Sequence, residues 1–327
     1  MSAIVPWLAN AWQVWASRLA ADRVPHAVLV AGPAGLGKRA FVDALVASVL
    51  CTSRAADGHA CGACRGCRLR VAGTHPDLRR VTFALNDKGE PRSEIVVDQV
   101  RELGTRLVQT SQLGGWRVSV IDPAEAMNAA AANALLKTLE EPEPGAILVL
   151  VSDAPARLVA TIRSRCQRID ARFPSREVAG QWLAARGVAP ALAAASLELA
   201  AGNPGMALAL AGAAERTLAQ DVARDLAGIA SGAIRPAEAA ARWHKDNAEL
   251  RLVLAAQAVR LAAWQQAGHA AGDALGLTVP GDLHKLGAWW DRANRVREQL
   301  ATPLRADLML LDLLREWRAL SAPAPVR

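Results

Sequence analysis

Short runs of apolar, often β-branched residues alternate along the first half of the chain with longer segments in which apolar residues recur every three or four positions. The short runs are typical of buried strands, and the longer segments are typical of helices that cover a sheet. The pattern predicts strands at 26–30, 80–83, 118–121, 147–151 and 167–169, and helices at 6–21, 38–50, 95–109 and 127–139. Strands that alternate with crossover helices indicate an α/β fold with a parallel sheet, which carries its ligand chemistry at the carboxyl ends of the strands.

After a linker at Phe173 and Pro174 the pattern becomes helical. Ser175 is suited to begin the first of these helices, because its hydroxyl can accept a hydrogen bond from a free backbone N–H. Beyond about residue 213 the chain is rich in alanine, with leucine and tryptophan as its large apolar residues. Several tryptophans along the chain are predicted to fill helix interfaces: Trp12, Trp15, Trp182, Trp243 and Trp264.

A glycine-rich loop joins the first predicted strand to the helix that follows it. Gly32, Gly35, Gly37 and Lys38 fit the phosphate-binding pattern G-x-x-x-x-G-K-[ST] in all but its last place. Glycines let backbone N–H groups turn towards phosphate, and the lysine can reach the terminal phosphates. The last place should hold a hydroxyl that binds Mg²⁺, but Arg39 has no oxygen and adds a positive charge there.

Four cysteines follow the phosphate-loop helix within 17 residues: Cys51, Cys61, Cys64 and Cys67. The last three form a C-x-x-C-x-x-C repeat on a predicted tight turn, and Cys51 completes a tetrahedral set of thiols. In a reducing compartment such a set favours structural Zn²⁺ over disulfides, with incidental or redox-active thiols as the alternative. Four protein ligands leave no open position, so the predicted zinc is structural and not catalytic.

The composition indicates where in the cell the protein works but does not identify what it binds. The formal net charge of +7 permits contact with nucleic acid, but the basic residues are dispersed along the chain and form no concentrated stripe. We find no apolar run of the ~20 residues that a membrane helix needs and no charged region typical of a signal peptide at the start. A cytoplasmic location is therefore expected.

Two strings of residues carry a family resemblance. The string NALLKTLEEP covers residues 133–142, and TIRSRC covers residues 161–166. Both resemble the clamp-loader branch of the AAA+ ATPases, and within it the delta-prime type of subunit of bacterial DNA polymerase III. The resemblance implies three domains. These are an AAA+ P-loop domain over 1–171 with an inserted zinc module at 51–67, a small helical lid over 172–212, and a helical collar that joins subunits over 213–327.

The resemblance also gives roles to single residues. Asp122 stands where P-loop ATPases hold the Mg²⁺ shell, but Pro123 follows it in place of the catalytic glutamate. Ser152 stands at the polar sensor of the γ-phosphate, and Gly205 stands where ATP-hydrolysing relatives have a sensor arginine. Arg165 corresponds to an arginine finger that points out of its own subunit into the nucleotide site of a neighbour.

Three positions are thus altered around one nucleotide site, at Arg39, Pro123 and Gly205, while the finger is retained. The resemblance implies a ring member that hydrolyses ATP poorly or not at all, binds ATP or ADP weakly if it binds them, and supplies Arg165 to a partner. The implied partners are gamma/tau motor subunits and a delta subunit of the DNA polymerase III holoenzyme. The resemblance further implies the sliding clamp and primed DNA as partners that this chain meets through the assembled complex. Two alternatives stay open: an ATP-hydrolysing motor subunit of gamma/tau type, and a zinc-dependent DNA-binding module.

Overall fold

The computed structural model describes residues 4–85, 89, 92–268, 277, 282–300 and 304–321. The chain divides into two compact units between Phe173 and Pro174. The further boundary at residue 212, between lid and collar, stays a prediction.

A five-stranded parallel sheet forms the centre of the first unit. Its strands lie in the order β2-β3-β4-β1-β5. The bounds are β1 Ala27–Ala31, β2 Leu78–Val81, β3 Arg117–Ile121, β4 Ala146–Ser152 and β5 Gln167–Asp170. All residues of β1 and β4 are buried, as expected for central parallel strands covered on both faces. The parallel α/β fold predicted from the sequence is therefore confirmed.

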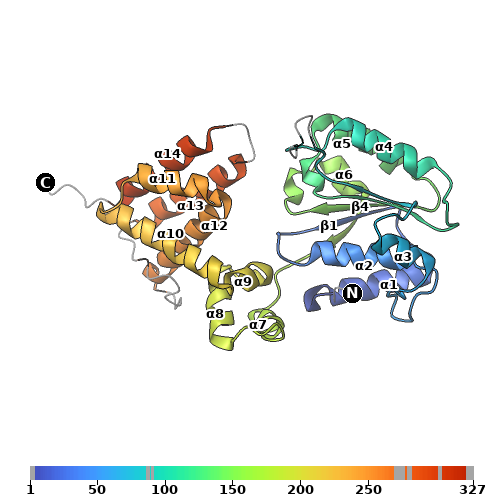
Figure 1. Ribbon diagram of the computed structural model, residues 1–327, viewed down its shortest axis with the longest axis horizontal. Helices are drawn as coiled ribbons and strands as arrows, with labels where there is room; N and C mark the ends of the chain where they lie inside the picture. Colours follow the sequence, from blue (N-terminus) through green and yellow to red (C-terminus); the bar gives the residue numbers. More distant parts are fainter. Residues whose placement is uncertain are drawn as a thin grey trace. The chain divides into compact units, whose positions relative to one another are not determined.

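Helices cover both faces of this sheet (Figure 1). The helix α2 (Lys38–Leu50) packs on one face, with α1 (Ala9–Ala20) and α3 (Arg65–Val71) beside it. On the other face lie α4 (Val97–Val108), α5 (Ala129–Glu140) and α6 (Ala160–Arg165). Short 3-10 turns lie at Pro6–Leu8, Ala124–Ala126 and Pro155–Arg157. Alternate residues of the strands, such as Leu29 and Leu148, pack against α4, α5 and α6 in one buried cluster.

Three of the predicted bounds that differ by two residues from those observed are explained by local contacts. The helix predicted from 95 begins at Val97, because Ile95 forms a β-bridge with Met127. The helix predicted from 127 begins at Ala129, because the Asn128 side chain accepts from the Ala131 N–H and caps it. The strand predicted at 80–83 lies two residues earlier, where Leu78 to Val81 pair with β3.

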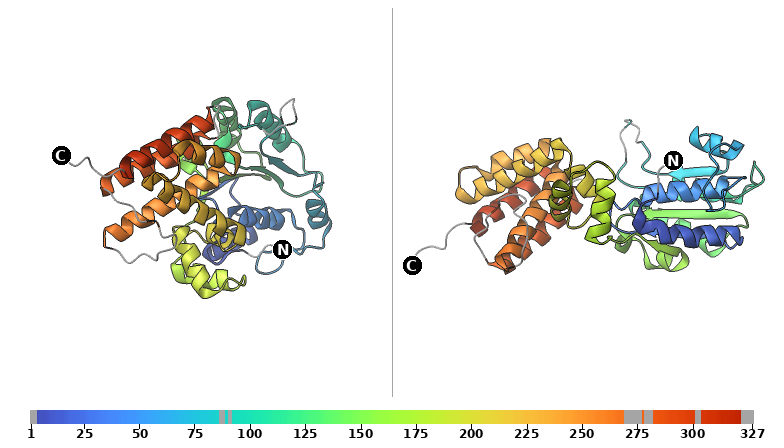
Figure 2. Two further views of the ribbon diagram at one scale, coloured as in Figure 1. Left: turned by 60° about the vertical axis from the view of Figure 1, so that its left-hand side comes forward. Right: turned by 90° about the horizontal axis from the view of Figure 1, so that it is seen from below.

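The described residues of the second unit form helices and the turns and loops that join them (Figures 1 and 2). Its helices are α7 Arg176–Ala184, α8 Pro190–Leu199, α9 Pro204–Leu210, α10 Ala213–Ser231, α11 Pro236–Lys245, α12 Ala248–Gln266, α13 Leu283–Gln299 and α14 Ala306–Ser321. The predicted cap is confirmed, since the Ser175 hydroxyl accepts from the Val178 N–H. One hydrophobic cluster runs from Ala179 on α7 to Trp317 on α14. No helix within the described ranges is both long and apolar enough to cross a bilayer.

Tryptophans fill the core of the second unit. Trp243, Trp289 and Trp317 are almost completely buried. Their indole N–H groups donate to the Asp225 carboxylate, the Leu313 carbonyl and the Leu226 carbonyl respectively, so no polar atom of these rings is buried without a partner. The prediction is wrong for Trp264, which is 44% exposed.

Candidate functional site

The phosphate-binding loop runs from the end of β1 to the start of α2, and all three of its predicted glycines, Gly32, Gly35 and Gly37, have positive φ. Gly32 has a φ of +139°, and a side chain there would lie 2.2 Å from the Ala171 carbonyl oxygen. Gly37 precedes α2 with a φ of +78°, in the left-handed region that favours glycine. The backbone geometry of the loop therefore depends on its glycines.

Lys38 points back into its own loop. Its side chain is only 2% exposed, and its Nζ donates to the carbonyl oxygens of Gly32 at 2.6 Å and Pro33 at 2.7 Å. It also forms an ion pair with Asp153, with 2.5 Å between Nζ and Oδ1. An ammonium group has three N–H donors, so these three contacts use all of them. In this arrangement the lysine has no donor left for a phosphate.

Arg39 connects two carboxylates at the sheet edge. Its Nε and Nη2 donate to the two carboxylate oxygens of Asp122, each at 2.8 Å, and Nη2 also contacts Asp153 Oδ2 at 3.0 Å. A guanidinium bound at both oxygens of one carboxylate is a strong, oriented contact. The carboxylate predicted to hold Mg²⁺ is thus paired with a protein cation.

Asp153 joins the two cations and follows β4 directly. Burial alone would raise the pKa of Asp153, but the Lys38 and Arg39 charges hold the pKa of this carboxyl below its ordinary value. Glu125 holds the same turn, since its Oε1 accepts from the backbone N–H groups of Asp153 at 2.9 Å and Ala154 at 3.2 Å. An aspartate that stays ionised is therefore fixed between two basic side chains.

Neighbouring strands bring these residues together. The strands β3, β4 and β1 are adjacent and parallel, so Asp122, Ser152 and the phosphate loop meet at the carboxyl edge of the sheet. The Ser152 carbonyl accepts from the Gly32 N–H at 3.2 Å. The Ser152 hydroxyl is fully buried and, within the described ranges, has no hydrogen-bond partner. Gly205 lies in the second unit, on α9.

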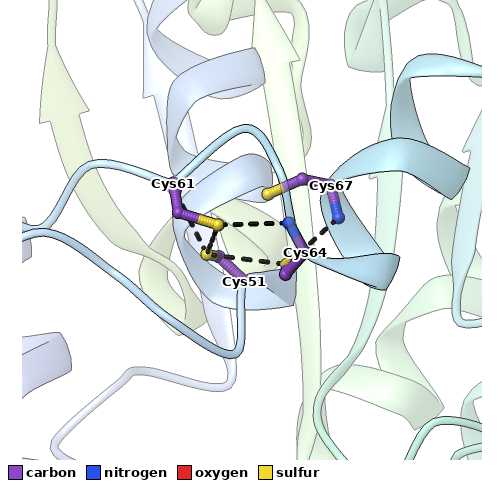
Figure 3. A group of neighbouring side chains, drawn as sticks. All are labelled: Cys51, Cys61, Cys64 and Cys67. Atoms are coloured by element: carbon purple, nitrogen blue, oxygen red, sulfur yellow. Dashed lines mark hydrogen bonds between the residues drawn. The ribbon is translucent and has the colours of Figure 1, made fainter.

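The four predicted cysteines form a single cluster beside α2 (Figure 3). Their sulfur atoms all lie within 4.8 Å of one another. The Cys51 Sγ is 3.6 Å from that of Cys61 and 3.9 Å from that of Cys64. Tetrahedral zinc with Zn–S bonds of about 2.3 Å requires sulfur atoms about 3.8 Å apart. The cluster can therefore hold a metal ion, and its donor set and spacing are consistent with zinc.

Backbone N–H groups surround these sulfur atoms. The N–H groups of Cys61 and Ser53 approach the Cys51 Sγ. The Cys64 N–H approaches the Cys61 Sγ, and the Cys67 N–H approaches the Cys64 Sγ. The Cys67 N–H lowers the pKa of the Cys64 thiol to about 5, whereas burial raises the pKa of Cys67 to about 12. Such N–H contacts stabilise the thiolates that a metal requires.

The cysteine repeat is partly helical, where the sequence suggested only a tight turn. Cys64 is the N-cap of α3, and Cys67 lies in its first turn. The module is also fixed to α1. Trp12 stacks on His59 with ring centres 4.3 Å apart, and its indole N–H donates to the Asp57 carbonyl. These contacts attach the module to the face of the unit that carries the phosphate-loop helix.

Arg165, the predicted finger, is the last residue of α6. Its Nη2 lies 2.7 Å from the Glu140 Oε1, and its Nη1 donates to the Thr161 carbonyl at 3.1 Å. Its side chain is 36% exposed. Arg165 comes just before β5, which begins at Gln167 and runs parallel to β1 with Val28 opposite Gln167. It therefore lies at the edge where the strands begin, whereas its own phosphate loop lies where β1 ends.

Two residues that contact predicted site residues, Asp153 and Glu140, were not predicted from the sequence, and neither was Glu125 as the support of the Asp153 turn. A signal existed for Asp153, because it follows a buried strand at the edge where chemistry gathers in such sheets. Glu140 lies in the family-like string 133–142, but nothing in that string indicates that it meets Arg165.

Comparisons with known proteins agree on one family. A family model described as "DNA polymerase III, delta subunit" matches residues 7–174. DNA polymerase III subunit delta' of Pseudomonas aeruginosa is 46% identical over 184 residues, which are 56% of this chain and 53% of the relative. The corresponding subunit of Escherichia coli is 41% identical over 208 residues, 63% of this chain and 60% of the relative. DNA polymerase III subunit tau of Bacillus subtilis is 31% identical over 157 residues, 48% of this chain and 26% of the relative.

The matches to the delta' relatives thus span between half and two thirds of their length. The family model covers nearly the whole of the first unit. The resemblance seen in the two strings of residues is confirmed by these relatives.

Proposed function

The chain belongs to the family described as DNA polymerase III, delta subunit, and from this premise we propose that it is the delta-prime-type subunit of a replicative clamp loader. In this proposal it does not turn over ATP usefully itself. It supplies Arg165 to the nucleotide site of a neighbouring motor subunit while the sliding clamp is loaded onto primed DNA. Its partners are gamma/tau subunits and a delta subunit, and it works in the cytoplasm.

The ion pairs around the phosphate loop support a subunit without ATP turnover. A working P-loop site offers its lysine to phosphate and its acid to Mg²⁺. Here the three donors of Lys38 contact acceptors of the same chain, and Asp122 is bound at both oxygens by Arg39. ATP with Mg²⁺ would have to displace several charge-assisted contacts before it could bind. The same network argues against the alternative of a gamma/tau-type motor.

The position of Arg165 carries the proposal that the finger acts on a neighbour. The strand β5 separates Arg165 from the carboxyl edge, and at about 3.3 Å per residue its four residues alone span about 10 Å. Arg165 therefore cannot serve the loop that ends β1 in its own subunit. With a side chain 36% exposed, it can meet a phosphate of an adjacent chain. Such a finger is worth ~10³–10⁵ in rate, because it stabilises charge that develops in the transition state.

The cysteine cluster is proposed to hold structural Zn²⁺. Cys51, Cys61, Cys64 and Cys67 would be its four ligands. Zinc at this place would join the end of α2 to the start of α3 and so keep the inserted module folded on the phosphate-loop helix. It would take no part in hydrolysis. The basic residues are dispersed along the whole sequence, so a zinc-dependent DNA-binding module remains the weaker alternative.

Reconstitution tests the proposed function. The chain is purified and mixed with gamma/tau and delta subunits, and clamp loading on primed DNA is measured together with ATP turnover. We expect the complete mixture to load clamps, the mixture without this chain to lose loading, and the chain alone to release no phosphate. Loading that does not depend on this chain, or ATP turnover by the isolated chain, would contradict the proposal.

A further inference from the structure

The C-terminal ends of α5 and α6 are connected by one ion pair between Glu140 and Arg165. We propose that Glu140 is a positioning residue for Arg165, holding its guanidinium in place for the phosphate of the neighbouring subunit. This inference rests on the proposed function, because it presupposes that Arg165 is a finger. Both residues are the last of their helices, and the two helices pack against each other on one face of the sheet.

Glu140 stands where a helix disfavours a carboxylate. The C-terminal end of a helix carries partial negative charge from its free carbonyl groups, so an acid in the last turn is unfavourable unless a cation meets it. Arg165 supplies that cation at 2.7 Å. The ion pair with Arg165 therefore offsets the unfavourable interaction of Glu140 with the end of α5.

The contacts of Arg165 hold it without using all its donors. A guanidinium has five N–H donors. One Nη2 donor meets Glu140 and one Nη1 donor meets Thr161, and within the described ranges no other acceptor contacts Arg165. Three N–H donors remain for a phosphate. Lys38 differs in this respect, because its three donors are all used within its own loop.

Positioning matters for this side chain because arginine is long and flexible. A free arginine loses much rotamer freedom when it must meet a phosphate in one geometry. A contact made in advance reduces that loss, and small displacements of a catalytic group are costly in rate. Glu140 is half exposed, so its effect should be modest compared with that of Arg165 itself. We expect ATP turnover of the assembled complex to fall about ten-fold in Glu140→Ala, against ~10³ or more in Arg165→Ala.

The test compares Glu140→Ala, Glu140→Gln, Arg165→Ala and the double variant Glu140→Ala/Arg165→Ala, each assembled with gamma/tau and delta subunits on primed DNA with clamp. Glu141→Ala is the matched control, since Glu141 is the adjacent exposed carboxylate and makes no ion pair within the described ranges. Turnover is measured as kcat and KM for ATP. Thermal unfolding of each free chain and gel filtration of each complex show whether a variant is folded and assembled.

The expected result is a lower kcat for Glu140→Ala with KM unchanged, partial recovery in Glu140→Gln because an amide oxygen can still accept from Arg165, and no change in Glu141→Ala. The double variant should be no slower than Arg165→Ala, because Glu140 acts only through Arg165. A Glu140→Ala complex as fast as wild type, or a double variant slower than Arg165→Ala by the full Glu140 factor, overturns the inference while leaving the finger intact. An Arg165→Ala complex as fast as wild type instead overturns the proposed function.

Discussion

Lys38 and Arg39 are adjacent basic residues that share one carboxylate, that of Asp153. A lysine that is only 2% exposed is costly unless acceptors surround it, and the carboxylate of Asp153 supplies the only negative charge among its three contacts. Arg39 adds a cation where a catalytic P-loop has a hydroxyl, and Asp122 and Asp153 balance it. The phosphate loop is therefore closed, meaning that Lys38 and Arg39 are paired with carboxylates of the same chain, and these ion pairs stabilise it.

Replacement of Asp153 tests this balance. Asp153→Asn should lower the free energy of unfolding at pH 7 by about 1–3 kcal/mol, because Lys38 keeps its charge and loses its ionic partner. The pKa of Asp153 is lowered in the folded state, so its contribution is complete above the unfolded pKa of about 3.9 and is lost as the pH falls through the folded value. Denaturant unfolding of wild type and variant at pH 7 and below pH 4 checks this.

Asp98→Asn serves as the control, because Asp98 forms an ion pair on α4 with its side chain 84% exposed. This variant should unfold like wild type at both pH values. If the difference in free energy of unfolding between Asp153→Asn and wild type is the same in acid as at pH 7, the ionic explanation is contradicted.

Nucleotide binding by the isolated chain is a second test at the residue scale. Because the donors of Lys38 and both oxygens of Asp122 are already engaged, ATP with Mg²⁺ should bind weakly or not at all. Calorimetric titration at millimolar ATP should give no binding heat, and thermal unfolding should not shift with ATP. Saturable heat together with a raised melting temperature would show that the loop opens to nucleotide.

The residues of the loop were predictable, but their pairing was not. The glycines, Lys38 and Arg39 follow from a pattern of fixed spacing. Asp122 and Asp153 meet Arg39 from positions 83 and 114 residues away. Only the order of strands in the sheet brings them together, and a single sequence does not state that order.

At the scale of elements, the cysteine module illustrates both success and failure of the sequence pattern. The set of four thiols was predicted, and the structure gathers all four. The helix α3 was not predicted, because a seven-residue segment with Gly66 in its first turn gives too little periodicity to indicate a helix. The strands of the sheet and the helices α2 and α4 were predicted within about two residues, since their apolar runs are long enough to be specific.

Zinc content tests the module. Cys64→Ser should remove the zinc from the full chain, where wild type binds one ion per chain, and should lower the melting temperature, because three thiolates hold zinc less tightly and the start of α3 loses its anchor. Metal analysis and thermal unfolding of the purified chain measure both effects.

The matched control is Cys166→Ser. Cys166 is buried outside the cluster, and burial raises the pKa of its thiol to about 11. This variant should keep its zinc even if its melting temperature falls. Equal zinc content in Cys64→Ser and wild type would show that the four thiols do not form the metal site.

At the scale of the whole molecule, the phosphate loop and Arg165 lie at opposite edges of the sheet of the first unit. The closed phosphate loop lies where the strands end, and Arg165 lies where they begin. A chain with this arrangement cannot combine its own loop and its own finger at one nucleotide, so the proposed activity requires a second chain. The family match supports the first unit directly, whereas the roles of residues 172–212 as a lid and of residues 213–327 as a collar stay predictions.

The most direct test is ATP turnover by the complex assembled with gamma/tau and delta subunits on primed DNA with clamp, comparing wild type with Arg165→Ala. Arg163→Ala is the control, since Arg163 lies on the same helix. We predict that the Arg165→Ala complex assembles normally and that the ATP turnover that depends on this chain falls ~10³-fold or more. The Arg163→Ala complex should turn over ATP at nearly the wild-type rate. Turnover in the Arg165→Ala complex equal to wild type would contradict the account.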